Sequence, residues 1–239
     1  MARNRRFLLL VAAVVVAALV VGSVVAIGAG RGDSTPGTTT RAKSPAAAAS
    51  SPATAFLAGV PQDGLTLGKP TAPATLLEFV DPQCPYCARW SEATFPVVVR
   101  RFVKTGRLRL ELRGLHFLGP DSETALRAVL AAAQQNKAWN MLDELYARQG
   151  AENSGWVTDA VLEEAATAAG VDVAKMRAAH DSPRVTAQIL EADAAASTLG
   201  VPGTPSFALA RPPATPQLLT IPSLEPADFA ASLESDLDR

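Results

Sequence analysis

Cysteine and histidine are scarce in this sequence, with two of each among 239 residues. A structural zinc site needs four ligands, and His116 and His180 do not stand at zinc-finger spacing from Cys84 and Cys87. We therefore expect no metal site. A disulfide between Cys84 and Cys87 would close a very short loop, which restricts the unfolded chain too little to act as a strong staple. The spacing C-x-x-C favours a chemical role for the pair over a structural one.

The sequence also lacks a basic surface for nucleic acid. Six of the 22 Lys and Arg residues precede Phe56, with only one of the 23 Asp and Glu residues, so the remainder has a net charge of about −6. Binding to phosphate backbones requires the opposite sign, which excludes nucleic acid as an expected partner. We find no internal repeat and no glycine-rich phosphate loop, and we expect no cofactor beyond a redox-active cysteine pair.

A long apolar run is present only at the N-terminus. Phe7–Ile27 contains no charge and is long enough to cross about 30 Å of hydrocarbon as a helix. Arg3, Arg5 and Arg6 precede it, so the positive-inside tendency predicts a cytoplasmic segment at 1–6 and an extracytoplasmic remainder. We expect a single-pass transmembrane anchor in the cell membrane. Small residues follow the run, so the alternative is a cleaved signal peptide and a secreted protein.

A linker and one folded domain are expected after this run. Residues 28–55 are rich in Gly, Ser, Thr, Pro and Ala and poor in large apolar side chains, a composition that cannot bury enough surface to fold. The segment 56–239 has the size of a single domain and is long enough to bury a core.

The first half of this domain has a strand–helix–strand pattern. The segment 75–80 is almost continuously apolar, which is typical of a strand buried on both faces. A helical stripe over 84–105 follows, with Pro96 expected to bend it. Leucines then alternate with charged residues over 107–113, as in a strand with one wet face. These elements predict a βαβ unit with parallel strands.

The second half predicts a helical block and a return to the sheet. Helical patterns fill the region from about 121 to 199, and Gly and Pro separate them. After the helical block we expect two strands and a final helix. In chain order, the elements are helices in 121–148 (meeting near Asn136), 158–169, 173–180 and 184–199, strands at 206–210 and 217–221, and a helix at 226–237. We therefore expect a three-layer α/β fold, with a central mixed sheet and an all-helical domain inserted at 121–199.

The position of the cysteines predicts their chemistry. Cys84 would stand at the N-terminus of a helix, where free backbone N–H groups and the helix dipole stabilise an anion. Such cysteines have lowered pKa values and attack disulfides as thiolates, so Cys84 is the predicted nucleophile. Cys87, one turn deeper, suits a shielded resolving thiol. Pro85 stiffens the first helical turn and Tyr86 adds an uncharged aromatic neighbour.

Two other positions are candidate site residues. Glu78 is the one acidic residue in an apolar strand six residues before Cys84, and a buried carboxyl there could relay the proton of Cys87. The alternative is a solvated Glu78 at a sheet edge. Thr204-Pro205 precedes a strand, where a cis peptide bond is common, and the backbone of Thr204 could bind an extended substrate peptide.

The quoted segments LEFVDPQCPYCARW and, about 120 residues later, VPGTPSF resemble the DsbA-like family of thioredoxin-fold thiol:disulfide oxidoreductases. The resemblance covers about 60–239 and implies the thioredoxin fold. It implies that Cys84 attacks, that Cys87 resolves, and that Thr204 and a cis Pro205 line the substrate groove.

The same resemblance implies that an acidic residue at the place of Glu78 carries a proton. Tyr86 stands where the best-known member of the family has a histidine, so any stabilisation of the thiolate by an imidazolium is absent.

Two classes of function remain open from the sequence. The first is an enzyme that oxidises thiols of exported proteins and passes electrons to a membrane quinone oxidoreductase, DsbB-like or similar to vitamin K epoxide reductase, as the resemblance implies. Within this class a disulfide isomerase or reductase is the alternative to a disulfide-forming oxidant. The second class is a non-catalytic peptide-binding chaperone module that uses the groove beside Pro205.

Overall fold

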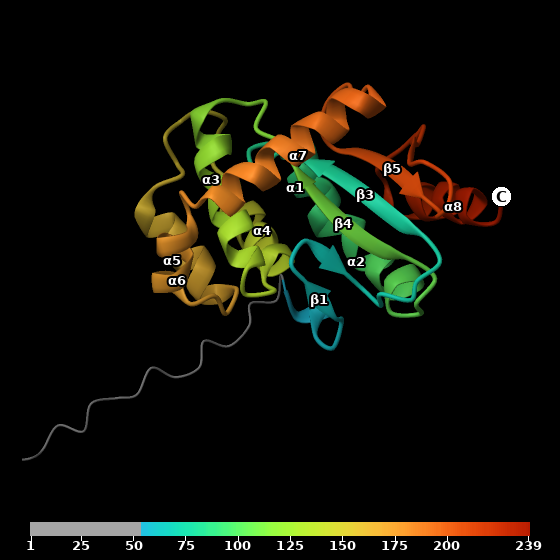
Figure 1. The fold of residues 1–239 in the computed structure, drawn as a ribbon, viewed down its shortest axis with the longest axis horizontal. Helices are drawn as coiled ribbons and strands as arrows, with labels where there is room; N and C mark the ends of the chain where they lie inside the picture. Colours follow the sequence, from blue (N-terminus) through green and yellow to red (C-terminus); the bar gives the residue numbers. More distant parts are fainter. Residues whose placement is uncertain (1–53) are drawn as a thin grey trace, which may run out of the picture. The chain divides into compact units, whose positions relative to one another are not determined.

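The computed structural model describes residues 54–239, and these form one six-stranded mixed sheet with helices on both faces (Figure 1). The strand order is β1-β2-β4-β3-β5-β6, with only β3 and β4 parallel. The strands are β1 (Gln62–Asp63), β2 (Thr66–Leu67), β3 (Thr75–Val80), β4 (Arg109–Gly114), β5 (Ser206–Ala210) and β6 (Gln217–Leu218).

The central strand β3 is buried along its whole length, as its apolar sequence predicts. Successive side chains of a strand point to opposite faces, and the two cores follow this alternation. Leu76 and Val80 belong to the larger core, whereas Leu77 and Phe79 pack against the helix on the other face. The same alternation places Glu78 on the side of the larger core.

The helix after the cysteine motif is interrupted where one bent helix is expected. It consists of α1 (Pro85–Ala93), α2 (Phe95–Val98) and a π-helical segment, η2 (Val99–Val103). Thr94 lies at the first break and donates a hydrogen bond from Oγ1 to the carbonyl oxygen of Leu224, 2.5 Å away. Pro96 cannot donate a helical hydrogen bond, and it occupies the first turn of α2, where none is required.

The C-terminal helix α8 (Pro226–Leu237) has the expected bounds and covers the same face as α1. Its Phe229 contacts Trp90 of α1 and Phe207 of β5, with ring centroids 5.5 and 4.8 Å away. This aromatic cluster joins the cysteine helix, the sheet and the C-terminal helix.

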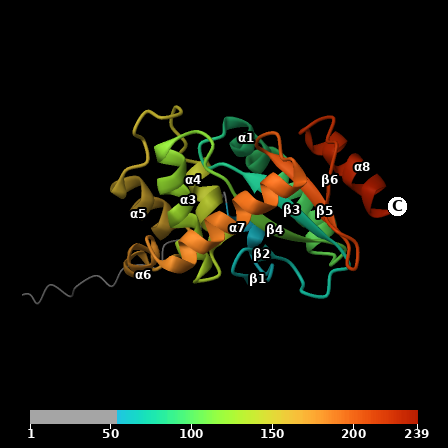
Figure 2. The same cartoon turned by 45° about the horizontal axis from the view of Figure 1, so that its top comes forward.

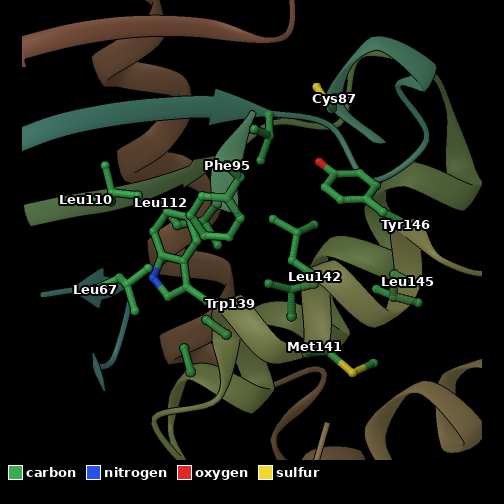
Figure 3. Packing of buried hydrophobic residues seen from close by; sticks show 14 of the residues in the cluster. Leu67, Cys87, Phe95, Leu110, Leu112, Trp139, Met141, Leu142, Leu145 and Tyr146 are labelled. Atoms are coloured by element: carbon green, nitrogen blue, oxygen red, sulfur yellow. The ribbon is translucent and has the colours of Figure 1, made fainter. Parts of the chain in front are cut away.

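The predicted helical block lies between β4 and β5. Asn136, with φ of 57°, separates its first two helices, as expected. The packing of the second of these against the sheet is shown in Figure 3, where Trp139 lies beside Phe95 and the leucines of β4. The helices are α3 (Pro120–Ala133), α4 (Ala138–Tyr146), α5 (Asp159–Ala168), α6 (Val173–Ala179) and α7 (Pro183–Leu199).

Helix α7 belongs to both the block and the sheet, which refines the expected insertion at 121–199. Ala192 and Ala196 in its second half pack on Leu77 and Phe79 of β3. Figures 1 and 2 show α7 running from α5 and α6 across the sheet. The third layer of the fold is therefore the end of the helical block itself.

Two further differences concern short segments. The expected strand at 217–221 is reduced to Gln217–Leu218, and the hairpin of β1 and β2 has no counterpart in the sequence expectations. The expected cytoplasmic segment 1–6 and anchor 7–27 lie outside the described residues, as does the linker 28–55 except for residues 54 and 55. Residue 55 begins a 3-10 turn, η1 (Ala55–Leu57). Within residues 54–239, none of the helices combines the length and the apolar character needed to span a bilayer.

Candidate redox site

Cys84 occupies the N-cap of α1, immediately beyond the loop that leaves β3. Its backbone is extended, with φ of −71° and ψ of 117°, and its Sγ accepts a hydrogen bond from the backbone N–H of Cys87 at 3.4 Å. Pro85 fills the first helical position, where its missing N–H is not needed. The expected placement of a sulfur at a helix N-terminus is confirmed.

The surroundings of Cys84 favour its thiolate. The hydrogen bond with the Cys87 side chain is the largest cause that lowers the pKa of Cys84 from 9.0 to about 6. The Thr204 side chain and the backbone N–H groups of Cys87 and Tyr86 act in the same direction, while burial opposes them. These donors therefore favour the thiolate form of Cys84.

Cys87 has the opposite character. It is 1% exposed, and burial, followed by its hydrogen bond to Cys84 and the charge of Cys84, raises the pKa of its thiol well above 9.0. Both cysteines are free thiols. The pair therefore consists of one sulfur that readily carries charge and one that retains its proton.

The segment Thr204-Pro205 lies against Cys84, as expected. The Thr204–Pro205 peptide bond is cis, and the Cys84 thiol donates a hydrogen bond to the carbonyl oxygen of Thr204 at 3.2 Å. The Ser206 hydroxyl donates to the carbonyl oxygen of Gly203 at 2.7 Å, which fixes the turn before β5. Residues 120 positions apart in the chain thus form one wall of the site.

The accessible surface beside the cysteines is aromatic. Pro85 is exposed, Tyr86 is 58% exposed, and the Arg89 guanidinium lies 5.8 Å from the centre of the Tyr86 ring. Phe117, 57% exposed, stands in the loop that follows β4, and the next residue, Leu118, donates its backbone N–H to Asp81 Oδ2 at 3.0 Å. Pro85 and Tyr86 stand in the cysteine motif itself, whereas Phe117 carries no local signal, because tertiary hydrogen bonds bring its loop to residues 80–83.

A buried polar network holds the loop before Cys84 to the helical block. Asp81 Oδ1 accepts hydrogen bonds from the Gln83 backbone at 2.8 Å and from the Ser122 hydroxyl at 2.6 Å. Gln83 Oε1 accepts from the Asn153 backbone N–H at 2.7 Å. Gln149 Nε2 donates to the carbonyl oxygen of Pro82 at 2.8 Å. Apart from the local Asp81–Gln83 bond, these partners are far apart in sequence, and no local pattern reveals them.

Glu78 is a buried carboxyl group, and the alternative of a solvated position at a sheet edge is wrong. It is 2% exposed, in the central strand, and burial followed by the charge of Asp143 raises its pKa well above 4.5. Asp143 lies in α4 and accepts a hydrogen bond from the Ser91 hydroxyl at 2.6 Å. Burial also raises the pKa of Asp143 to about 7. No local sequence pattern identifies Asp143 as a site residue.

Tyr146 completes the floor of the site. Figure 3 shows its ring between Cys87 and the leucines of α4. The hydroxyl donates a hydrogen bond to the carbonyl oxygen of Asp81 at 3.3 Å, and burial, followed by the charges of Cys87 and Glu78, raises its pKa. A buried, un-ionised phenol therefore lies beside the Cys87 thiol.

A protein-family model described as thioredoxin matches residues 61–211, which include both cysteines and Pro205. This is more than half of the chain. The chain belongs to the thioredoxin family, as a DsbA-like disulfide oxidoreductase homologue. The family resemblance inferred from the cysteine motif and the proline turn is thereby confirmed.

This DsbA-like protein is similar to named disulfide-bond-formation proteins in sequence and to thioredoxin-like oxidoreductases in structure. "Probable disulfide bond formation protein D" of Bacillus cereus is 31% identical over 99 residues, which cover 41% of this chain and 46% of the relative. A thioredoxin-like oxidoreductase from Silicibacter pomeroyi is 28% identical, with a TM-score of 0.58, over 75% of this chain and 93% of the other.

The oxidised structure of BdbD from Bacillus subtilis has a TM-score of 0.63 at 19% identity, over 74% of this chain and 94% of that chain. This similarity shows the thioredoxin-like fold with its mixed sheet and helical insertion. The alignment with the Bacillus cereus relative spans less than half of that protein's length.

Proposed function

We propose that this protein is an extracytoplasmic thiol:disulfide oxidoreductase that forms disulfides in exported proteins. The observation that carries the proposal is the contrast between the two thiols, since the pKa of Cys84 is lowered to about 6 while that of Cys87 is raised. In this reaction Cys84 forms the mixed disulfide with the substrate, and Cys87 is the resolving thiol that forms or leaves the Cys84–Cys87 disulfide. The names of the relatives, which describe disulfide bond formation, support the same reaction.

The reaction balances with the cysteine pair as its only redox group. A substrate thiolate attacks Cys84 of the oxidised pair, the Cys84–Cys87 bond breaks, and Cys87 leaves and takes up a proton. A second substrate thiolate then attacks the substrate sulfur of the mixed disulfide and releases Cys84 as a thiolate. Two electrons move from the substrate to the pair, and the substrate gains one disulfide.

The direction follows from the thiolate. Every donor that stabilises the Cys84 thiolate stabilises the reduced protein, and a more stable reduced form makes the disulfide a stronger oxidant. Two observations support peptide substrates: Pro85 and Tyr86 are exposed beside the pair, and the carbonyl of Thr204, next to the cis Pro205, lies against Cys84. An extended peptide would hydrogen-bond to the backbone of Thr204.

The reduced pair must pass two electrons onward before the next turnover. A DsbB-like or vitamin K epoxide reductase-like quinone oxidoreductase of the membrane is the partner we propose. A membrane anchor at 7–27 would support this step, because a tether raises the effective concentration of the two proteins.

The decisive measurement is the equilibrium of the Cys84–Cys87 pair against glutathione, together with oxidation of a reduced, unfolded secreted protein. We expect stoichiometric oxidation of the substrate, lost in Cys84→Ala. Activity that survives Cys84→Ala would indicate a peptide-binding chaperone module instead. In intact cells, thiol trapping should find the pair mostly oxidised, and a mostly reduced pair would support an isomerase or reductase.

A further inference from the structure

Two buried carboxyl groups, Glu78 and Asp143, lie in the interior near Tyr146, whose hydroxyl is affected by the charges of both Cys87 and Glu78. Glu78 is 2% exposed in β3, and Asp143 is 6% exposed in α4. One oxygen of each, Glu78 Oε2 and Asp143 Oδ2, has no hydrogen-bond partner among the described residues. Buried polar atoms without partners are rare in native proteins, so this pair of carboxyl groups requires an explanation.

Asp143 also borders a pocket that reaches the surface. The pocket, of about 690 Å³, lies between α1 and α4, and the exposed side chains of Arg89 and Glu92 line it together with Asp143 and Ser91. The Ser91 hydroxyl donates to Asp143 Oδ1 at 2.6 Å and thereby fixes the carboxyl group at the wall. Asp143 thus stands between the solvent in this pocket and the interior that contains Glu78.

We infer that Asp143 is a proton-relay residue that carries protons between Glu78 and the solvent of this pocket while Cys87 gains or loses its proton. This inference rests on the proposed thiol exchange and deepens it. It assigns the exit of the proton to the α1–α4 side of the molecule, away from the substrate groove beside Thr204.

The electrostatic coupling of the two acids supports the relay. The charge of Asp143 adds to burial in raising the pKa of Glu78, so the two carboxyl groups are coupled and a proton on one favours ionisation of the other. Burial raises the pKa of Asp143 to about 7, and the charge of Glu144 adds to this effect. The other titratable or charged groups near Asp143 are Arg89, Glu92 and Tyr146, which line the same pocket, and Arg148, which pairs with Glu144. Because burial favours the protonated form of Glu78, this residue can accept the proton of Cys87 by passing its own proton to Asp143.

In the step that closes the Cys84–Cys87 disulfide, the sulfur of Cys87 attacks Cys84 in a mixed disulfide. The S–H bond of Cys87 breaks, and its proton moves to Glu78. The proton that Glu78 held moves to the Asp143 carboxylate and from there to water. The Cys84–Cys87 bond forms, and the bound partner leaves as a thiolate.

The test follows the two cysteines separately with 5,5′-dithiobis(2-nitrobenzoate) and the reduced full-length protein. The first release of nitrothiobenzoate reports the attack of Cys84, and the second reports the attack of Cys87 on the mixed disulfide. In Asp143→Asn, which keeps an acceptor for Ser91, we expect an unchanged first phase. The second phase should slow about a hundredfold near pH 8, the low end of what general acid–base catalysis contributes.

The sign of the change separates a relay from a simple charge effect. Removal of a negative charge near Cys87 would by itself lower the pKa of the Cys87 thiol and accelerate the second phase. Glu92→Gln removes a charge from the same pocket and should leave both phases as in the wild type. A second phase in Asp143→Asn that is unchanged or faster overturns the relay.

A second variant and the choice of reagent keep the test decisive. The Ser91 hydrogen bond lowers the pKa of Asp143, so Ser91→Ala should shift the pH midpoint of the second phase upward, and an unshifted midpoint also contradicts the relay. The assay uses no protein substrate. Failure to oxidise a secreted protein would therefore remove the proposed function, while the two phases would still test Asp143.

Discussion

At the Cys84 sulfur, the hydrogen bond with the Cys87 side chain contributes more to the lowered pKa than the Thr204 side chain or the helix amides. Cys87→Ala removes that donor, so we expect the pKa of Cys84 to rise from about 6 by about one unit. Cys87→Ser keeps a hydroxyl donor and should raise it less. Ultraviolet absorbance of the remaining thiolate, followed against pH, measures both variants. Equal values in the wild type, the serine variant and the alanine variant would assign the shift to the helix amides instead.

Glu78 sets a stability that depends on pH. Its pKa is raised in the folded protein, so the native state binds a proton more tightly than the unfolded state, and stability falls as pH rises above about 4.5. Glu78→Gln cannot ionise and should be more stable than the wild type near pH 8, by about 2 kcal/mol, because the wild type must then either hold a proton against the pH or bury a charge.

Urea unfolding at two pH values measures this effect. Near pH 4 the carboxyl is protonated in both states, and the advantage of Glu78→Gln should disappear. Glu164→Gln, on the exposed face of α5, is the matched control, with no pH-dependent difference expected. An advantage that is the same at both pH values would mean that Glu78 does not retain its proton on folding.

At the level of elements, the loop between β3 and α1 is held in place by the helical block. Asp81 is fully buried and accepts hydrogen bonds from the backbone of Gln83, the backbone of Leu118 and the hydroxyl of Ser122. Asp81→Ala leaves these donors buried without a partner, so we expect a loss of about 3 kcal/mol in the free energy of unfolding.

Chemical denaturation of Asp81→Ala against Glu164→Ala measures this loss. Glu164 is exposed in α5, and its replacement should change stability by less than about 0.5 kcal/mol. If Asp81→Ala is equally mild, the loop before Cys84 is fixed by the sheet and α1 alone, and the hydrogen bonds to α3 are incidental.

The sequence reveals elements whose identity depends on local pattern. The bounds of β3, β5 and α8 are correct to the residue, because a proline lies at or within two residues of the start of each apolar run or amphipathic stripe. The hairpin of β1 and β2 was missed, because two-residue strands are too short to show a period. The π-helical η2 was missed as well, since its side chains satisfy the helical stripe expected for 84–105.

At the scale of the whole molecule, the site combines parts that the sequence predicts with parts that it does not. The C-x-x-C turn and the Thr204-Pro205 segment carry local signals, and the prediction that they meet follows from the family resemblance. Asp143 carries no such signal. It is an ordinary acidic residue in an amphipathic helix until packing of α4 against α1 places it beside Ser91, 52 residues away in the sequence.

The redox state of the pair is coupled to the stability of the whole fold. The disulfide constrains the unfolded chain little, because its ring is short, so the two redox forms differ mainly through the Cys84 thiolate. The pKa of Cys84 is about 6 when folded, against 9.0 for an unperturbed thiol. A lowered folded pKa adds stability above the unfolded value and loses it as pH falls through the folded one.

The reduced protein should therefore be more stable than the oxidised protein near pH 8, and the gap should shrink as the pH falls towards 5. We expect a change in the gap of about 1 kcal/mol, smaller than the full shift implies because solvent screens a sulfur at a helix terminus. Glu78 and Asp143 titrate in both redox forms, so comparing the two forms at each pH removes most of their effect. Thermal unfolding of both forms across this range measures the gap. A gap that stays constant would mean that the Cys84 thiolate does not stabilise the reduced fold, and the argument for an oxidising pair would lose its basis.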